Sequence, residues 1–369
     1  MGTVLVAPDG FKGTVSAARA AEALAAGWLE ARPGDHVVRR PMADGGEGTL
    51  DAFASAVPGA HRMPVTVMGP GDREVEASWL LLPATGDAPG GTGVVELAST
   101  SGIELLRGLR PDDAHTIGFG EATAAALDYG VSRLVLGIGS SSSTDGGLGL
   151  LAALGARAID GHGRPVPPGL RGLAAVAEID LSEVRALPPG GVVVITDVTS
   201  PLTGPRGAAR VFGPQKGLDA RAIEQADCAL ERFAALVPAV RADAPGAGAA
   251  GGTGFALLAW GARLTAGAEE IAALVGLPDA VDGADAVLTG EGSYDGQSAA
   301  GKVPVYVARL AAARGRPALL AAGRISADAD IRPFARSVSL TGLAGSADAA
   351  MAAPERWLRV AGRTLAENG

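Results

Sequence analysis

The sequence predicts an α/β fold with one discontinuous domain, built on a parallel sheet with flanking helices, and a second α/β domain inserted into it. Short apolar runs alternate with alanine-rich segments of helical length along the 369 residues, which is typical of parallel sheets covered by helices. Apolar residues make up 47 % of the chain but aromatic residues only 4 %, so Ala, Val and Leu must form the core. The N-terminal part offers only two parallel strands, too few for a sheet.

The N-terminal segment predicts two strand–loop–helix units followed by a hairpin. Ser16 is a favourable N-cap for the first helix, which ends before Pro33. The expected elements are a strand at 4–7, a helix over 17–31, a strand at 36–40, a helix over 50–57, and hairpin strands at 62–67 and 74–82. The hairpin breaks the alternation, so we place a domain boundary near Met68.

The remaining chain predicts further strands and helices, and its last part resumes the alternation. The expected strands are 94–97, 134–138, 192–196, 286–289, 318–321 and 337–340. The expected helices are 121–129, 147–154, 220–237, 255–265, 303–314 and a last one from about 347. We infer that the N-terminal strands pair with the C-terminal units. This gives a discontinuous domain of residues 1–68 plus 284–369 and an inserted domain of residues 69–283.

The composition excludes several kinds of partner. The net charge is −9 with basic residues spread along the chain, so no surface for nucleic acid or an anionic membrane is predicted. Cys228 is the only cysteine, which rules out an intramolecular disulfide framework. The longest uncharged run, 244–262, contains Pro245 and predicts a loop followed by a helix. With no signal peptide expected, we predict a cytoplasmic protein acting on small molecules, of open oligomeric state.

Lysine usage is selective in this chain. Of 31 basic side chains, three are lysines, namely Lys12, Lys216 and Lys302. Each lies next to glycine, whereas incidental lysines usually occupy helix faces. A compact ammonium and a guanidinium are not interchangeable where a point charge meets a phosphate. We therefore predict that the three lysines serve an anion site, with chance survival in an arginine-biased sequence as the alternative.

Four glycine-containing loops with acidic or hydroxyl side chains follow apolar runs. They are residues 44–49, 137–147, 196–203 and 289–302. Ligands of an open α/β sheet bind outside the carboxyl ends of its strands, where backbone amides and helix N-termini meet anions. We therefore expect the loops to converge on one site. On composition alone, 137–147 would equally suit a polar turn.

Acidic residues in two of these loops suit Mg²⁺ or a substrate hydroxyl. Asp197 directly follows an expected strand, with capping of the next turn as its alternative role, and Glu291 and Asp295 are close enough in sequence to share a metal. Residues 296–302 match the first seven positions of a P-loop, but Val303 replaces the Ser or Thr that would bind Mg²⁺. The four histidines lie at no metal-ligand spacing, so no zinc site is expected.

Six segments together resemble the bacterial glycerate kinase family, of the type related to glycerate 2-kinases, along nearly the whole chain. They are A-P-D-G-F-K-G-T at 7–14, A-D-G-G-E-G-T at 43–49, G-I-G-S-S-S-S-T-D-G-G at 137–147, D-V-T-S-P-L at 197–202, F-G-P-Q-K-G at 212–217, and T-G-E-G-S-Y-D-G-Q-S at 289–298 with G-K-V-P at 301–304. Each segment is weak alone, but six in this order are specific. All three lysines fall inside them.

The resemblance implies two α/β domains facing across a cleft. It also implies a kinase that uses ATP and Mg²⁺ to phosphorylate D-glycerate, with the 2-hydroxyl as the expected acceptor. The catalytic residues that it implies are Asp197, Lys12, Lys302 and Asp295. Glu291 and Asp295 would bind the metal. Asp197, or failing that Asp295, would accept the hydroxyl proton, and the lysines would neutralise phosphate charge.

The same resemblance implies a set of substrate- or phosphate-binding residues. Amides of Gly45, Gly46 and the serine loop, residues 140–143, would hold a phosphate or the glycerate carboxylate. The full expected set is Asp9, Asp44, Gly45, Gly46, Glu47, Gly48, Thr49, Ser140, Ser141, Ser142, Ser143, Asp145, Gly146, Gly147, Thr199, Gln215, Lys216 and Gln297.

Three other interpretations stay open. The same loops would serve a kinase for another small hydroxy acid, or a glycerate kinase that forms 3-phosphoglycerate. A two-domain regulator that binds a ligand without catalysis is the interpretation from another class. The retained acids and lysines favour the enzyme.

Overall fold

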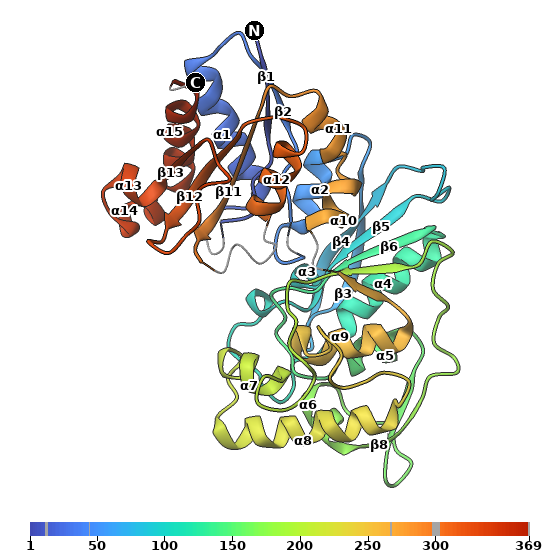
Figure 1. Ribbon diagram of the computed structural model, residues 1–369. Coiled ribbons are helices and arrows are strands. Elements are labelled where there is room, and N and C mark those ends of the chain that lie inside the picture. Colours follow the sequence, from blue (N-terminus) through green and yellow to red (C-terminus); the bar gives the residue numbers. More distant parts are fainter. Residues whose placement is uncertain (12–13, 44, 266–267, 297–302, 368–369) are drawn as a thin grey trace. The chain divides into compact units, whose positions relative to one another are not determined.

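The computed structural model describes residues 1–11, 14–43, 45–265, 268–296 and 303–367, and its contacts divide the chain into two compact units (Figure 1). Unit 1 consists of Met1–Asp44, Asp51–Pro58 and Gly267–Gly369. Unit 2 consists of Gly45–Leu50 and Gly59–Ala266. Unit 1 therefore contains segments from both ends of the sequence, and unit 2 is nearly continuous.

Unit 1 contains a parallel sheet of five strands in the order β13-β12-β11-β1-β2. Its strands are β1 (Thr3–Val6), β2 (His36–Arg39), β11 (Ala286–Tyr294), β12 (Ala318–Ile325) and β13 (Arg336–Ser339). Strand β1 lies between β2 and β11, and Val4 pairs with Ala286 (Figure 1). The expected parallel pairing of the first strand with a C-terminal strand is present.

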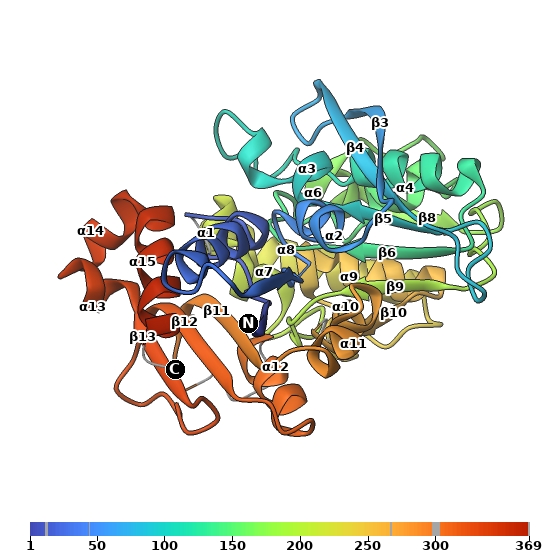
Figure 2. The same cartoon turned by 90° about the horizontal axis from the view of Figure 1, so that it is seen from above.

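The helices of unit 1 surround this sheet. They are α1 (Ala17–Ala31), most of α2 (Thr49–Ala56), α10 (Ala268–Leu274), α11 (Leu277–Asp282), α12 (Val303–Ala312), α13 (Leu340–Ala344), α14 (Ala347–Ala352) and α15 (Pro354–Glu367). Helices α1 and α15 lie side by side (Figures 1 and 2). A Cβ atom on Gly27 would lie 1.8 Å from the carbonyl oxygen of Arg359, so only glycine allows this approach. Ser16 caps α1 as expected, accepting from the amide of Arg19.

Unit 2 contains a mixed sheet of six strands in the order β10-β9-β6-β5-β4-β3. Its strands are β3 (His61–Met68), β4 (Glu74–Leu82), β5 (Thr92–Glu96), β6 (Arg133–Gly137), β9 (Val192–Ile195) and β10 (Arg263–Thr265). The last four are parallel, and the β3–β4 hairpin joins them in antiparallel order. The loops that follow β5, β6 and β9 therefore leave the same edge of the sheet.

The other elements of unit 2 contribute to two apolar cores, one against this sheet and one among the helices and β8. They are α3 (Ala98–Ser101), η1 (Ile103–Leu105), α4 (Ile117–Tyr129), α5 (Leu148–Ala153), β7 (Arg157–Asp160), α6 (Gly169–Ala175), β8 (Val176–Asp180), α7 (Ala208–Phe212), η2 (Pro214–Lys216), α8 (Ala220–Leu236) and α9 (Ala249–Trp260). Helix α4 packs on β3, β4 and β5. Within the described ranges no helix combines the length and apolarity needed to cross a membrane.

The limits of the two units differ from the boundaries expected at 68 and 284. Strand β3 belongs to unit 2, because it pairs with β4 along its whole length from His61 to Met68. Helices α10 and α11 belong to unit 1, because both pack against α12. The chain passes from unit 1 to unit 2 between Pro58 and Gly59, about ten residues before the boundary expected near Met68.

Two expected elements also end elsewhere. The helix predicted over 255–265 ends at Trp260, and Arg263–Thr265 form β10, whose pairing with β9 extends the sheet of unit 2. The strand predicted at 286–289 continues to Tyr294, because β11 pairs with β12 as far as Ile325. In both cases pairing with a strand distant in sequence determines where the element ends.

Candidate active site

The carboxyl ends of β1 and β11 place two acidic residues on adjacent strands of unit 1. The amide of Asp9 donates to the carbonyl of Gly290 at 2.8 Å, directly before Glu291 in the sequence. The buried hydroxyl of Thr289 donates to the carbonyl of Ala7 at 2.8 Å and fixes the two strand ends to each other. Glu291 is itself 94 % buried, with 6 % of its surface exposed, so this edge holds acidic groups in a defined place.

Glu291 stands on β11 itself and not in the loop that the sequence predicts. Asp295 follows the last residue of the strand, four positions later, a spacing that places two side chains on one face of an extended chain. Proteins hold Mg²⁺ through one or two carboxylates together with substrate phosphates. No group of three or more His, Cys, Asp or Glu among the described residues is arranged to hold a metal. The two carboxylates therefore fit a metal that arrives with a nucleotide.

Two of the four glycine loops and the end of β9 meet within unit 2. The amide of Gly139 donates to the carbonyl of Gly45 at 2.8 Å, and a Cβ on Gly139 would lie 2.4 Å from the Cα of Gly46. A Cβ on Gly45, whose φ is +85°, would lie 2.3 Å from the carbonyl oxygen of Ile195. The loop after β6 thus approaches the backbone of Gly45 and Gly46, and the last residue of β9 approaches Gly45. The fourth glycine loop begins in unit 1, next to Asp9.

Glu96 fixes the start of α2 and was not among the expected site residues. Its carboxylate accepts from the amide of Gly48 at 3.1 Å and from the amide of Leu50 at 3.0 Å. Glu96 is 4 % exposed, and an anion at a helix N-terminus satisfies amides that have no partner within the helix. Glu96 is the last residue of β5, but the expected strand 94–97 placed it inside a strand, so the rule that singled out Asp197 as an acid following a strand missed it.

The serine loop turns sharply at its first residue. Ser140 is exposed and has a φ of +57°, a left-handed conformation that is unusual for a residue with a side chain. The hydroxyl of buried Ser142 donates to the carbonyl of Ser101 at 2.7 Å, and that of Ser143 donates to Asp145 at 3.1 Å. These two hydroxyls hold the loop in place, and the side chain of Ser140 is the one that faces solvent.

Asp145 organises the chain that follows the serine loop. It is fully buried and accepts hydrogen bonds from the amide and hydroxyl of Thr116, the hydroxyl of Ser143, and the amides of Gly147 and Gly149. Both carboxylate oxygens are occupied by protein donors. These contacts give Asp145 an internal, structural role, and the ligand contact that the resemblance implies for it stays a prediction.

Lys216 lies beneath the serine loop. Its side chain is 97 % buried, with 3 % exposed, and its ammonium donates to the carbonyl of Ser143 and, at 3.3 Å, to the hydroxyl of Ser141. Burial lowers the pKa of Lys216 to about 8, and the negative charge of Asp145 acts in the opposite direction. The lysine therefore contacts the loop from inside the protein.

A left-handed turn supports the serine loop from a second side. Three successive residues, Ala250, Gly251 and Gly252, have φ values of 52°, 69° and 95°. The carbonyl of Ala250 accepts from the hydroxyl of Ser141 at 3.3 Å. A Cβ on Gly251 would lie 2.1 Å from the carbonyl oxygen of Ser143. The sequence signal was the glycine-rich run 244–262, interpreted there only as a loop before a helix.

The other expected residues of unit 2 divide into exposed and internal ones. Asp197, Thr199, Gln215 and Glu47 are exposed, so they are available to a ligand. The internal residues contact the backbone: the hydroxyl of Thr49 donates to Gly46, the amide of Gly146 donates to Gly251, and the amide of Gly147 donates to Asp145. Lys12, Asp44, Gln297 and Lys302 lie outside the described residues.

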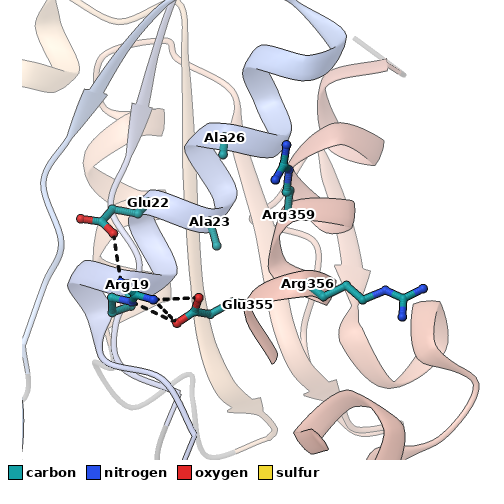
Figure 3. Close-up of a pocket in the computed structure, with 7 residues that line it drawn as sticks. All are labelled: Arg19, Glu22, Ala23, Ala26, Glu355, Arg356 and Arg359. Atoms are coloured by element: carbon teal, nitrogen blue, oxygen red, sulfur yellow. Dashed lines mark hydrogen bonds and ion pairs between the residues drawn. The ribbon is translucent and has the colours of Figure 1, made fainter. Parts of the chain in front are cut away.

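A charged groove lies between α1 and α15 in unit 1 (Figure 3). Its lining consists of Arg19, Glu22, Ala23, Ala26, Glu355, Arg356 and Arg359. Arg19 pairs with Glu355 at 2.9 Å and with Glu22 at 3.9 Å, and Arg359 pairs with Glu30. Both arginines therefore have acidic partners within the protein. We interpret the groove as a result of the packing of two charged helices.

The chain is similar to known proteins over nearly its whole length. The model of the glycerate kinase family matches residues 4–368. Glycerate 2-kinase of Escherichia coli is 38 % identical over 336 residues, covering 89 % of this chain and 87 % of that protein. Glycerate kinase of Bacillus subtilis is 40 % identical, covering 89 % and 86 %. A crystal structure from Salmonella typhimurium LT2, assigned to glycerate kinase 2, covers 100 % of this chain and 98 % of its own at a TM-score of 0.83 and 35 % identity.

Proposed function

This chain belongs to the glycerate kinase family, and we propose that it transfers the γ-phosphoryl group of ATP to the 2-hydroxyl of D-glycerate in the cytoplasm, with Mg²⁺ bound. The observation that carries the proposal is the pair of acids Glu291 and Asp295 at the carboxyl end of β11, next to Asp9. Acids at this edge of a parallel sheet suit a metal–nucleotide complex. The similarity to a protein named glycerate 2-kinase supports the 2-position.

The proposed reaction needs positioning and charge neutralisation more than covalent chemistry. The hydroxyl oxygen of glycerate attacks the γ-phosphorus while the bond from that phosphorus to the oxygen of ADP breaks. Asp197 accepts the hydroxyl proton, with Asp295 as the alternative base. Exposure of Asp197 at the end of β9 makes it available for this role.

The remaining groups bind charge. Glu291 and Asp295 would hold Mg²⁺, which when bound neutralises phosphate oxygens and orients them. In this proposal Lys12 and Lys302 neutralise the transferring phosphoryl group. Amides at Gly45 and Gly46, together with the serine loop, would hold a phosphate or the glycerate carboxylate, because backbone amides in left-handed turns favour anions.

ADP release tests the function directly. The purified protein should form ADP from ATP when D-glycerate and Mg²⁺ are present, and little in their absence. L-glycerate and related hydroxy acids serve as matched acceptors and detect a kinase of different specificity. A regulator without catalysis would release no ADP with any acceptor. Phosphorus NMR of the product then distinguishes 2-phosphoglycerate from 3-phosphoglycerate.

A further inference from the structure

We propose that Lys216 is a positioning residue, which fixes the active conformation of the serine loop from inside the protein without touching substrate. The inference rests on the proposed function, because the loop matters only if it binds an anionic group. The ammonium of Lys216 donates to two points of the loop, the hydroxyl of Ser141 and the carbonyl of Ser143. With 3 % of its surface exposed, the lysine is separated from solvent by the loop that it holds.

The conformation of Ser140 needs this support. Ser140 has a left-handed backbone, which costs conformational energy and persists only where the surroundings determine it. Lys216 holds Ser141 and Ser143 on one side, and the carbonyl of Ala250 accepts from Ser141 on the other. Removal of the ammonium would free the loop to relax at the residue exposed to a ligand.

The choice of lysine follows from the acceptors available. Two acceptors of the loop face a group with three N–H donors, and the compact ammonium on its flexible stem reaches both. A guanidinium would bury five donors at the same place. In a sequence with 31 basic residues and only three lysines, lysine at this buried position therefore has a geometric reason.

The charged groups around Lys216 are few. Burial lowers the pKa of Lys216 to about 8. The negative charge of Asp145, in the chain following the serine loop, acts in the opposite direction and raises that pKa. Helix α7 carries Arg210, which pairs at the surface with Asp227. Gln215 of η2 and the turn 249–252 are uncharged. Loss of the Lys216 proton in mild alkali thus removes a positive charge from beneath the loop.

The first experiment compares Lys216→Met with Arg210→Met, which removes an exposed cation from the same segment. We expect kcat of Lys216→Met to fall on the order of 100-fold, the loss that a misplaced substrate group produces, and kcat of Arg210→Met to change less than threefold. Hydrogen exchange, read by mass spectrometry on peptides spanning 138–147, should be faster in Lys216→Met and unchanged in α1. Unaltered exchange in this segment, or a kcat within threefold of wild type, would overturn the proposal.

The second experiment makes the ammonium at position 216 more acidic and leaves its length and charge nearly unchanged. In a Cys228→Ser background, Lys216→Cys is aminoethylated in the unfolded state and refolded, which places thialysine, a more acidic ammonium, at position 216. We expect activity to return at neutral pH and the alkaline limb of kcat/KM to move to lower pH. An unmoved limb in an active protein contradicts a role for this proton.

Failure of the proposed function is distinguishable from failure of this inference. If the wild-type protein forms no phosphoglycerate, the proposed function is wrong, and hydrogen exchange of 138–147 still decides whether Lys216 holds the loop. If refolding of the thialysine protein fails, the comparison of Lys216→Met with Arg210→Met decides alone, and unaltered exchange of 138–147 in Lys216→Met overturns the proposal.

Discussion

The carboxylate of Glu96 accepts a hydrogen bond from the amide of Leu50 at 3.0 Å, across 46 positions of sequence. A second bond, from the amide of Gly48 at 3.1 Å, uses the other carboxylate oxygen. The end of β5 therefore determines where the loop 45–48 turns into α2. Because Gly45 and Gly46 in that loop contact the chain after β6, Glu96 acts on the candidate site without belonging to it.

Replacement of Glu96 by Gln should weaken this arrangement. One oxygen remains as an acceptor, but an NH₂ group replaces the other and faces a backbone N–H. We expect a loss of about 2 kcal/mol in the free energy of unfolding, the range for hydrogen bonds to charged groups, and a fall of roughly tenfold in kcat/KM. Urea unfolding and steady-state kinetics measure the two effects.

Glu121→Gln is the matched control for this variant. Glu121 accepts from the amide of Met68 at 2.6 Å in the hairpin region, so its replacement also disturbs a carboxylate–amide contact. It should lower stability and leave kcat/KM within twofold. Equal kinetic losses in both variants would show that Glu96 acts only through general stability.

Gly251→Ala should be strongly destabilising. The new Cβ would meet the carbonyl oxygen of Ser143 at 2.1 Å, in addition to the strain of a φ of +69°. We expect a cost of about 2–4 kcal/mol from overpacking and strain together. Gly276→Ala shares the strain, since its φ is +65°, but its Cβ would meet no atom within 4 Å, and it should cost about 1 kcal/mol. Equal costs would contradict a tight contact with the serine loop.

Glu291→Gln should weaken the use of Mg²⁺. The variant removes one of the two carboxylates proposed to hold the metal, so the Mg²⁺ concentration that gives half-maximal activity should rise about tenfold or more. Glu178→Gln, which alters an exposed carboxylate on β8, should leave this concentration unchanged. Titration of activity with Mg²⁺ at saturating ATP measures both, and an unchanged midpoint for Glu291→Gln would remove it from the metal site.

Asp197→Asn and Asp295→Asn decide which acid accepts the hydroxyl proton. Loss of a general base lowers kcat by about 10² to 10⁴, whereas loss of a metal ligand is partly restored by more Mg²⁺. We expect Asp197→Asn to show the larger fall at every Mg²⁺ concentration. If only Asp295→Asn behaves in this way, the two roles are exchanged.

Lys216 should make stability rise with pH in a limited range. Its pKa is about 8 in the folded protein and near 10.5 in the unfolded chain. Between these values the unfolded state binds the extra proton, so the free energy of unfolding increases with pH. The difference between wild type and Lys216→Met should shift by roughly 3 kcal/mol in favour of wild type from pH 7.5 to 10.5. Urea unfolding across this range measures it, and a constant difference would show a normal pKa.

Much of the fold followed from pattern alone, because each strand–loop–helix unit carries its signals locally. Ser16, for example, caps α1 through its own side chain. The predicted element limits are wrong where pairing with a strand distant in sequence determines the secondary structure. Arg263–Thr265 have helical neighbours in sequence, yet they form β10 because β9 offers a free edge. In the same way, pairing with β12 extends β11 to Tyr294.

The site was predicted less evenly, for a related reason. Motifs indicated which loops matter, and Gly45 contacts Gly139 of the loop after β6 and Ile195 at the end of β9. Motifs do not show which way a side chain points. Asp145 and Lys216 appeared equivalent to their exposed neighbours, and only the packing of unit 2 shows that both face inward.

The place of β1 in its sheet has a consequence for synthesis. Residue Val4 leaves the ribosome early, but its neighbour Ala286 is added 282 positions later. Every residue of unit 2 precedes that partner, so unit 2 can fold on the nascent chain while β1 has only β2 as a neighbour and its other edge stays unpaired. Chaperone capture is therefore expected for this first segment during translation, and pausing after residue 266 would prolong that exposure.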